Sequence, residues 1–223
     1  MNPAYDRFLR GVLLNNFKTF DEKMIFGNQT SFTDNDTEAG RVYSYAIQSV
    51  DFEGNISSMT LPLSIIPAGE IKWDLTWKKS YSPIQISGDI KIPVGRTLTI
   101  EAGTEIVFKD TDEGRTGFRP QECEFIVEGT LLAEGTQEEP VRMISGAPFP
   151  GRKDWDGLRI LTGVNDDKTV LKNVLIAGAE NGLVLRSSNA DISDISFRFC
   201  DTGLGAFQVK NQVVENISAE ECN

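Results

Sequence analysis

The stretch that decides the fold is Ser82–Phe108, which reads SPIQISGDIKIPVGRTLTIEAGTEIVF. Apolar and polar residues alternate along both of its halves, and Pro93-Val94-Gly95 separates the two halves. A second glycine turn, Glu101-Ala102-Gly103, interrupts the latter half. Alternation with period two is typical of strands that bury one face, and proline and glycine mark the turns between them. The stretch therefore predicts short strands joined by tight turns.

The last part of the chain repeats itself. The segments LKNVLI, ISDISF and VENISA begin at positions 171, 192 and 214, in steps of 21 and 22 residues. No helical period is visible in this region. A repeat of this length with β-branched residues indicates a coil of stacked strands, in which each turn lies about 4.8 Å from the next. We interpret Asn173, Asp194 and Asn216, which share one repeat position, as an inward-facing polar ladder at a bend.

The first 68 residues also predict strands, without a helical pattern. Val42–Val50 alternates with period two, and Asp51–Asn55 has the composition of a hairpin turn. Pro67–Glu70 has the composition of a linker. The other expected strands are Tyr5–Leu9, Val12–Leu14, Lys23–Phe26 and the return strand Ile56–Ile65.

Three motifs carry a first family resemblance: Phe32-Thr33-Asp34, then Gly40-x-x-Tyr43-x-Tyr45-Ala46-Ile47, then Val50 to Ser57 with its D-x-x-G-N turn. They resemble the second half of a bacterial fibronectin type III domain. The resemblance implies a partial β-sandwich over residues 1–68. Such domains have seven strands, and the sequence before Tyr5 is too short for the first two. We therefore expect either a piece of a longer protein or strands supplied by another chain.

A second resemblance covers residues 70–223. Its motifs are the opening stretch, then IVEGTLLAEGTQEEPV at Ile126–Val141, then Trp155-Asp156-Gly157-Leu158-Arg159-Ile160. They are similar to the cap and early rungs of right-handed parallel β-helix proteins with pectin-lyase-like folds, which bacteria and archaea export. The expected fold is thus all-β. A β-helix spans residues 69–223, with a capping segment at 69–82 and about six rungs over 83–223.

Composition excludes several classes of function. The chain has a net charge of −11 and a pI near 4.6, so phosphate backbones and anionic membranes would repel it. No apolar run reaches the length of a membrane span. Histidine is absent, which removes the commonest general base and zinc ligand. We expect no nucleic-acid partner and no membrane insertion.

Two functions remain open. The first is a non-enzymatic extracellular or cell-surface module with a structural or adhesive role, whose partner is a surface protein or a glycan. No signal peptide precedes the strands, and the chain ends at Asn223 just as a new repeat begins. We therefore expect either a fragment or a subunit that self-assembles through the open coil end or by strand donation. The alternative is a carbohydrate-binding or polysaccharide-degrading β-helix. No catalytic residue and no cofactor is assigned.

Four residues are candidates for contact with carbohydrate. Trp73 and Trp77 are spaced to share one face of a short turn; we favour a cap over the first rung, with a sugar-stacking platform as the alternative. Asp166 and Asp167 could mimic the paired aspartates of polygalacturonases, although a solvated loop is the simpler interpretation.

Calcium is the one metal that the sequence suggests. Asp110, Asp112 and Glu113 could supply the oxygen ligands that this ion prefers, but their spacing is not that of an EF-hand, and a polar loop is the default interpretation.

Two of the three cysteines, Cys200 and Cys222, occupy the same repeat position and should stack on adjacent rungs. Neighbouring parallel strands come within disulfide range. Reduced cysteines packed in the core are the preferred interpretation, and a disulfide is the alternative.

Overall fold

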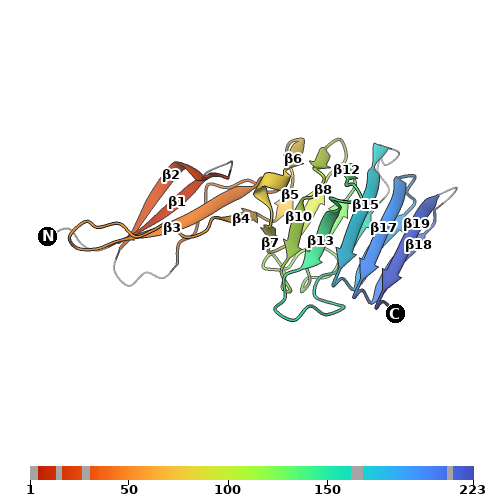
Figure 1. Ribbon diagram of the computed structural model, residues 1–223. Coiled ribbons are helices and arrows are strands. Elements are labelled where there is room, and N and C mark those ends of the chain that lie inside the picture. Colours follow the sequence, from red (N-terminus) through yellow and green to blue (C-terminus); the bar gives the residue numbers. More distant parts are fainter. Residues whose placement is uncertain (1–4, 14–16, 27–30, 162–167, 210–212) are drawn as a thin grey trace.

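The chain forms an elongated, nearly all-β body with an antiparallel sheet at the N-terminal end and stacked parallel strands beyond it (Figure 1). This computed structural model describes residues 5–13, 17–26, 31–161, 168–209 and 213–223. Helix in these ranges takes 3-10 form, in the turn η1 at Lys79–Tyr81 and at Lys168. The expectation of an all-β fold is confirmed, and so is its parallel-strand character.

The N-terminal strands lie in one antiparallel sheet of order β2-β1-β3-β4. Their bounds are β1 Tyr5–Leu13, β2 Phe17–Phe26, β3 Tyr43–Val50 and β4 Leu63–Ile66. The two short strands expected over residues 5–14 are therefore one strand, and the return strand is shorter than expected. The hairpin turn forms as expected, because both Glu53 N and Asn55 N donate to Asp51 Oδ1. Among the described residues these strands make a single layer.

Beyond β3 the chain winds through three stacks of parallel strands, visiting them in a fixed order and returning one level further on. The first stack holds β4, β7 Ile84–Ile86, β10 Glu105–Phe108, β13 Val141–Ser145 and the C-terminal parts of β15 Val170–Ala177, β17 Asp191–Arg198 and β19 Val214–Glu220. The second holds β5 Gly69–Glu70, β8 Ile90–Ile92, β11 Glu124–Val127, β14 Gly157–Ile160, β16 Asn181–Arg186 and β18 Thr202–Phe207. The third holds β6 Leu75–Trp77, β9 Thr97–Ile100, β12 Thr130–Glu134 and the N-terminal parts of β15, β17 and β19.

The register of the last turns agrees with the repeat in the sequence. Ile176 lies opposite Phe197, and Phe197 lies opposite Ala219. The chain bends within β15, β17 and β19 at Asn173, Asp194 and Asn216, whose φ angles of 48°, 57° and 53° are in the left-handed region. Asparagine and aspartate tolerate this region better than other side chains do. The expected bend is therefore present, although Asn173 and Asp194 are half-buried rather than fully inward.

The two parts of the chain share one sheet, because β4 pairs with β3 on one edge and with β7 on the other. The expected linker at 67–70 was wrong: Gly69 and Glu70 form β5, which pairs with β8. Residues 69–82, expected as a cap, supply two of the three strands of the first turn and η1. The segment before β3 covers this turn, because the indole Nε1 of Trp77 donates to Gly40 O over 2.8 Å.

The core is a continuous column of apolar side chains inside the coil. Strands such as β9 and β10 bury every second residue, as alternation predicts. Phe108 and Trp155, from separate turns, stack with ring centroids 4.0 Å apart and an interplanar angle of 1°. The ring centroids of Phe108 and Phe125 lie 6.3 Å apart, and those of Phe125 and Trp77 lie 5.6 Å apart. Aromatic stacking between turns therefore links the levels of the coil from within.

Candidate functional site

The two tryptophans do not share a face. Trp73 is 51 % exposed, whereas Trp77 is 1 % exposed and belongs to the core. Because no sugar ring can stack on a buried indole, Trp77 is corrected from a carbohydrate-contact candidate to a core residue. Asp166 and Asp167 lie outside the described residues.

The three calcium candidates do not converge on one point. Asp112 is buried, and its carboxylate accepts hydrogen bonds from Gly114 N at 2.8 Å and Thr116 N at 2.7 Å, so it organises its own loop. Glu113 binds Lys109 at 2.7 Å, and this hydrogen bond lowers the pKa of Glu113. Asp110 is exposed. The grouping of acidic side chains that the structure does show lies elsewhere.

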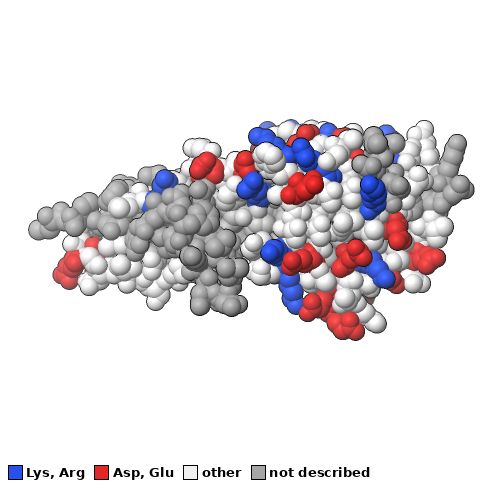
Figure 2. Space-filling model, turned by 90° about the horizontal axis from the view of Figure 1, so that it is seen from above, with Lys and Arg blue, Asp and Glu red and all other residues white. Residues whose placement is uncertain are grey.

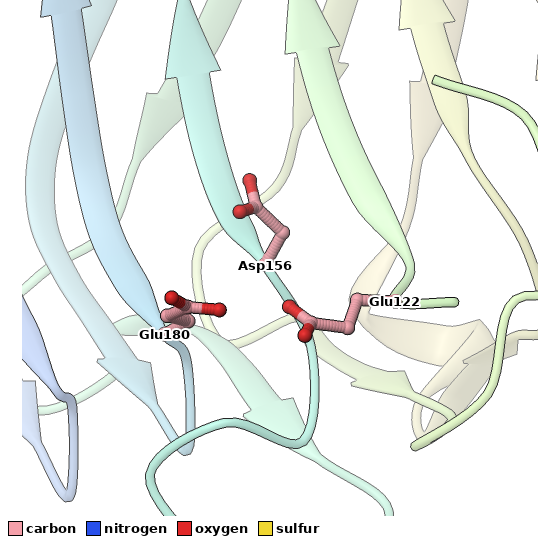
Figure 3. A group of neighbouring side chains, drawn as sticks. All are labelled: Glu122, Asp156 and Glu180. Atoms are coloured by element: carbon pink, nitrogen blue, oxygen red, sulfur yellow. The ribbon is translucent and has the colours of Figure 1, made fainter. Parts of the chain in front are cut away.

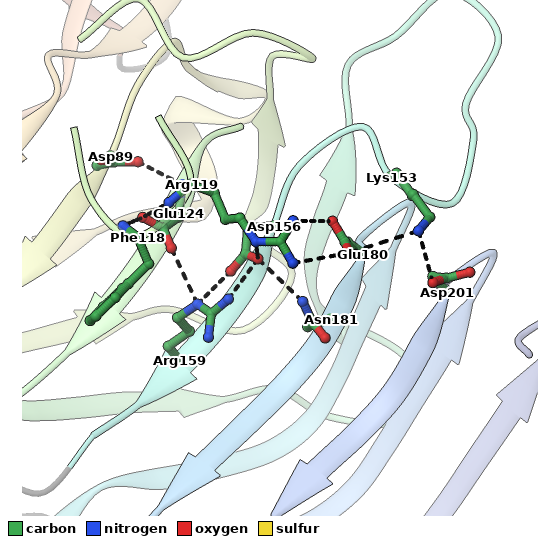
Figure 4. A network of polar contacts seen from close by, with 10 residues as sticks. All are labelled: Asp89, Phe118, Arg119, Glu124, Lys153, Asp156, Arg159, Glu180, Asn181 and Asp201. Carbon is green, nitrogen blue, oxygen red and sulfur yellow. Dashed lines mark hydrogen bonds and ion pairs between the residues drawn. The ribbon is translucent and has the colours of Figure 1, made fainter. Parts of the chain in front are cut away.

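That grouping follows the edge where the first stack turns into the second, and Figure 4 shows most of it. Acidic side chains from successive turns line up there because parallel strands in register place equivalent residues one above the other. We call this set the acidic corner; its members are Asp89, Glu122, Glu124, Asp156, Glu180 and Asp201.

Arg159 holds the centre of the acidic corner. Its Nε lies 2.5 Å from Asp156 Oδ2 and its Nη2 lies 2.7 Å from Asp156 Oδ1, a bidentate pair. The same Nε lies 3.2 Å from Glu124 Oε1. That oxygen accepts no well-aligned hydrogen bond, but the short distance to a guanidinium makes it ion-paired. The side chains of Asp156 and Glu124 are 0 % exposed and that of Arg159 is 17 % exposed, so this is a buried ion pair.

A loop between β10 and β11 closes over the next two carboxylates. Asp89 Oδ2 accepts from the hydroxyl of Thr116 at 2.6 Å, and Glu124 Oε2 accepts from Phe118 N at 2.5 Å. Gly117 is required between them: a Cβ there would lie 1.8 Å from Glu124 Oε2 and 2.6 Å from Asp89 Oδ2, and its φ is +72°. Burial raises the pKa of both Asp89 and Glu124.

Three members of the acidic corner come within metal-ligand distance of one another. Carboxylate oxygens of Glu122, Asp156 and Glu180 all lie within 4.8 Å (Figure 3). Glu122 Oε2 is buried and has no hydrogen-bond partner, and burial, together with the nearby Glu180, raises the pKa of Glu122. Carboxylate oxygens are the ligands that calcium and magnesium prefer, so these are the residues that could hold such an ion.

Two basic side chains from the longer loops pair with two members of this trio, Asp156 and Glu180. Arg119 Nη1 lies 3.0 Å from Glu180 Oε2, and Arg119 Nε lies 3.8 Å from Asp156 Oδ1; the charge of Glu180 raises the pKa of Arg119. Lys153 lies 3.1 Å from Asp201 and 3.8 Å from Glu180, and the hydrogen bond to Asp201 raises the pKa of Lys153 and lowers that of Asp201. Basic side chains thus occupy the space around the trio.

The sequence did contain a signal for this corner. Asp156-Gly157-Leu158, Glu180-Asn181-Gly182-Leu183 and Asp201-Thr202-Gly203-Leu204 each place an acid shortly before Gly-Leu. Aligning these three segments would have stacked the acids. Asp156 appeared in the sequence only as part of the rung motif Trp155–Ile160, and no site role was predicted for Glu122 or Glu180.

A polar groove of about 1000 Å³ lies on a different side of the coil, along the bends between the third and first stacks. Its lining comes from successive turns and includes Arg142, Lys172, Asn173, Ser196 and Arg198. Figure 2 shows basic and acidic side chains interspersed over the surface of the coil in that view.

Comparison with family models, with curated proteins and with solved structures finds no match to this chain. A search of the described residues for a helix long and apolar enough to cross a membrane finds none.

Proposed function

We propose that the coil is a right-handed parallel β-helix of the pectin-lyase-like kind, and that the chain is a non-enzymatic structural or adhesive module at or outside the cell surface. The observation that carries this proposal is the unbroken first stack. It continues the antiparallel sheet through β4 and runs to β19, which gives a long body stabilised along its axis (Figure 1). An elongated solenoid serves as a spacer or as an extended contact surface.

The charges of the acidic corner support a structural role. Arg159, Arg119 and Lys153 each bind carboxylates from turns other than their own. Glu124, whose raised pKa would suit proton transfer, is fully buried and ion-paired, so a substrate cannot reach it. These ion pairs join levels of the coil, as a load-transmitting module requires.

Two measurements test the proposal. Antibodies against the chain should label intact cells of the source organism, and labelling that needs permeabilised cells would contradict the location. Acidic and neutral polysaccharides incubated with the chain, with and without calcium, should keep their chain length. Cleavage that is lost on substitution of an acidic-corner residue would replace the structural role with an enzymatic one.

We propose that the partner of this module is a second copy of the same chain. In the sheet order of the described residues, β2 has a hydrogen-bonded neighbour, β1, on one edge only. The fibronectin-like motifs lie in a single sheet layer, which a donated strand from another copy would complete. Sedimentation velocity over a range of concentrations should show association, and a monomer at all concentrations would contradict it.

Carbohydrate binding is the second candidate, and the polar groove favours it. Amide, hydroxyl and cationic groups recur there from turn to turn, about 4.8 Å apart, which suits an extended polymer of hydroxylated units. On a glycan array, Lys172→Glu should lose the signals of the wild-type chain, and the exposed Lys78→Glu outside the groove should keep them. Equal changes of the glycan-array signal in the two variants would contradict carbohydrate binding in the groove.

A further inference from the structure

We propose that Cys200 and Cys222 are a site of disulfide formation that cross-links two successive turns of the coil. β17 and β19 run in parallel with Arg198 opposite Glu220, and each cysteine follows two residues later. The pairing continues past the strands, because Phe199 N donates to Glu220 O over 3.1 Å. Parallel neighbours about 4.8 Å apart fall inside the range of Cα separations that disulfides span.

The two thiols occupy equivalent positions one turn apart. Cys200 Sγ lies 3.5 Å from Arg198 O, and Cys222 Sγ lies 3.6 Å from Glu220 O. Each sulfur therefore approaches the carbonyl two residues before it, so both side chains leave the backbone in the same direction. Burial raises the pKa of Cys200 to about 11, and contact with the Cys222 thiol contributes to that rise.

The two cysteines form a stacked pair in one column of the coil. Cys200 is buried and Cys222, one turn further on, is half-buried. One turn before Cys200, the equivalent position holds Ala179. In the described coil, cysteine therefore stacks on cysteine only at Cys200 and Cys222.

The exposure of Cys222 defines the order of the reaction. The thiolate of Cys222 attacks a small-molecule disulfide, forming a mixed disulfide and releasing one thiol. Cys200 then loses its proton to solvent and attacks Cys222 Sγ, which closes the protein disulfide and releases the second thiol. Two protein thiols are oxidised and one external disulfide is reduced. The high pKa of Cys200 makes the second step slow at neutral pH and faster as pH rises.

The test uses the full chain, reduced and then treated with oxidised glutathione at pH 8. Thiols counted after denaturation should fall from three to one, and peptide mapping should join Cys200 to Cys222 within a monomer. The number of thiols in Cys123→Ser should fall from two to none, because Cys123 takes no part in the bridge. Burial raises the pKa of Cys123 to about 12. Cys222→Ser should keep both of its remaining thiols. Cys200→Ser should form the mixed disulfide at Cys222 and react no further.

Three results would overturn the proposal. They are retention of all three thiols in the wild-type chain, a bridge that includes Cys123, and a bridge between two chains. Because Cys222 is near the surface, its serine variant keeps the core intact and remains informative if Cys200→Ser fails to fold. The cross-link does not depend on the proposed function, since it would form or fail in the same way in an enzyme.

Discussion

Replacement of Arg159 by methionine is the sharpest test of the acidic corner. The substitution keeps an apolar chain of similar length but leaves the carboxylates of Asp156 and Glu124, both 0 % exposed, without their guanidinium. Removal of one partner from a buried ion pair typically costs about 3–5 kcal/mol, because the remaining charge loses its closest counter-charge and does not regain water. We expect Arg159→Met to lower the free energy of unfolding at pH 7 by about this amount.

The loss should depend on pH in a direction fixed by Glu124. Burial already raises the pKa of Glu124 in the folded chain, so folding favours its protonated form. Loss of Arg159 would raise that pKa further. The destabilisation of Arg159→Met is therefore complete at pH values above the pKa of Glu124 in the folded variant. It becomes smaller as pH falls toward the ordinary glutamate pKa of about 4.3.

The assay is urea unfolding of wild type and variant at several pH values between 7 and 4, followed by tryptophan fluorescence. The matched control is Arg142→Met, which removes a surface pair whose side chains are 44 % and 33 % exposed and should cost at most about 1 kcal/mol. Equal losses in Arg159→Met and Arg142→Met, or a loss in Arg159→Met that is the same at pH 7 and pH 4, would refute the buried ion pair.

Three further outcomes follow from the structure. Calcium should leave the thermal unfolding midpoint of the wild-type chain unchanged. It should raise the midpoint of Arg119→Ala, because this substitution empties the space beside the carboxylate trio. An Arg119→Ala midpoint that calcium does not change would contradict this prediction. Gly117→Ala should cost about 1–3 kcal/mol of unfolding free energy in urea, because its Cβ would meet two carboxylates at a positive φ, and a neutral result would show that the loop closes differently. Trp77→Phe should cost about 0.5–1.5 kcal/mol through its lost hydrogen bond, whereas Trp73→Phe should stay within about 0.5 kcal/mol; the reverse order in urea unfolding would contradict the burial of the two residues.

Periodicity was the part of the fold that the sequence could predict. The alternation in Ser82–Phe108 and the repeat that begins at position 171 were enough for an all-β coil with bends at Asn173 and its equivalents, because burial in stacked strands imposes both patterns. The role of β4 could not be predicted. The alternation of its four residues fits an antiparallel partner and a parallel partner equally well. Only the three-dimensional pairing shows that β4 is antiparallel to β3 and parallel to β7.

The candidate site was harder to predict because longer loops interrupt the repeat. Glu180 and Asp201 lie in regular turns, where aligning the repeats places them together. Glu122 lies near the end of the loop between β10 and β11, and Glu124 is the first residue of β11; the length of the loop hides the level of both residues in the coil. The basic residues that reach the corner from such loops carry no repeat signal at all.

This division between regular turns and loops explains the chemistry of the corner. Regular turns place Glu180 and Asp201 on adjacent levels about 4.8 Å apart, where like charges repel. The loop before β14 brings Lys153 between them, and the loop before β11 brings Arg119 between Asp156 and Glu180. Each insertion therefore offsets a repulsion that the repeat itself creates. A coil without both loops would keep its strands, its apolar column and the Arg159–Asp156 pair, but Glu180 and Asp201 would stack without Arg119 and Lys153. These insertions therefore contribute to the stability of the coil as well as to any ligand site.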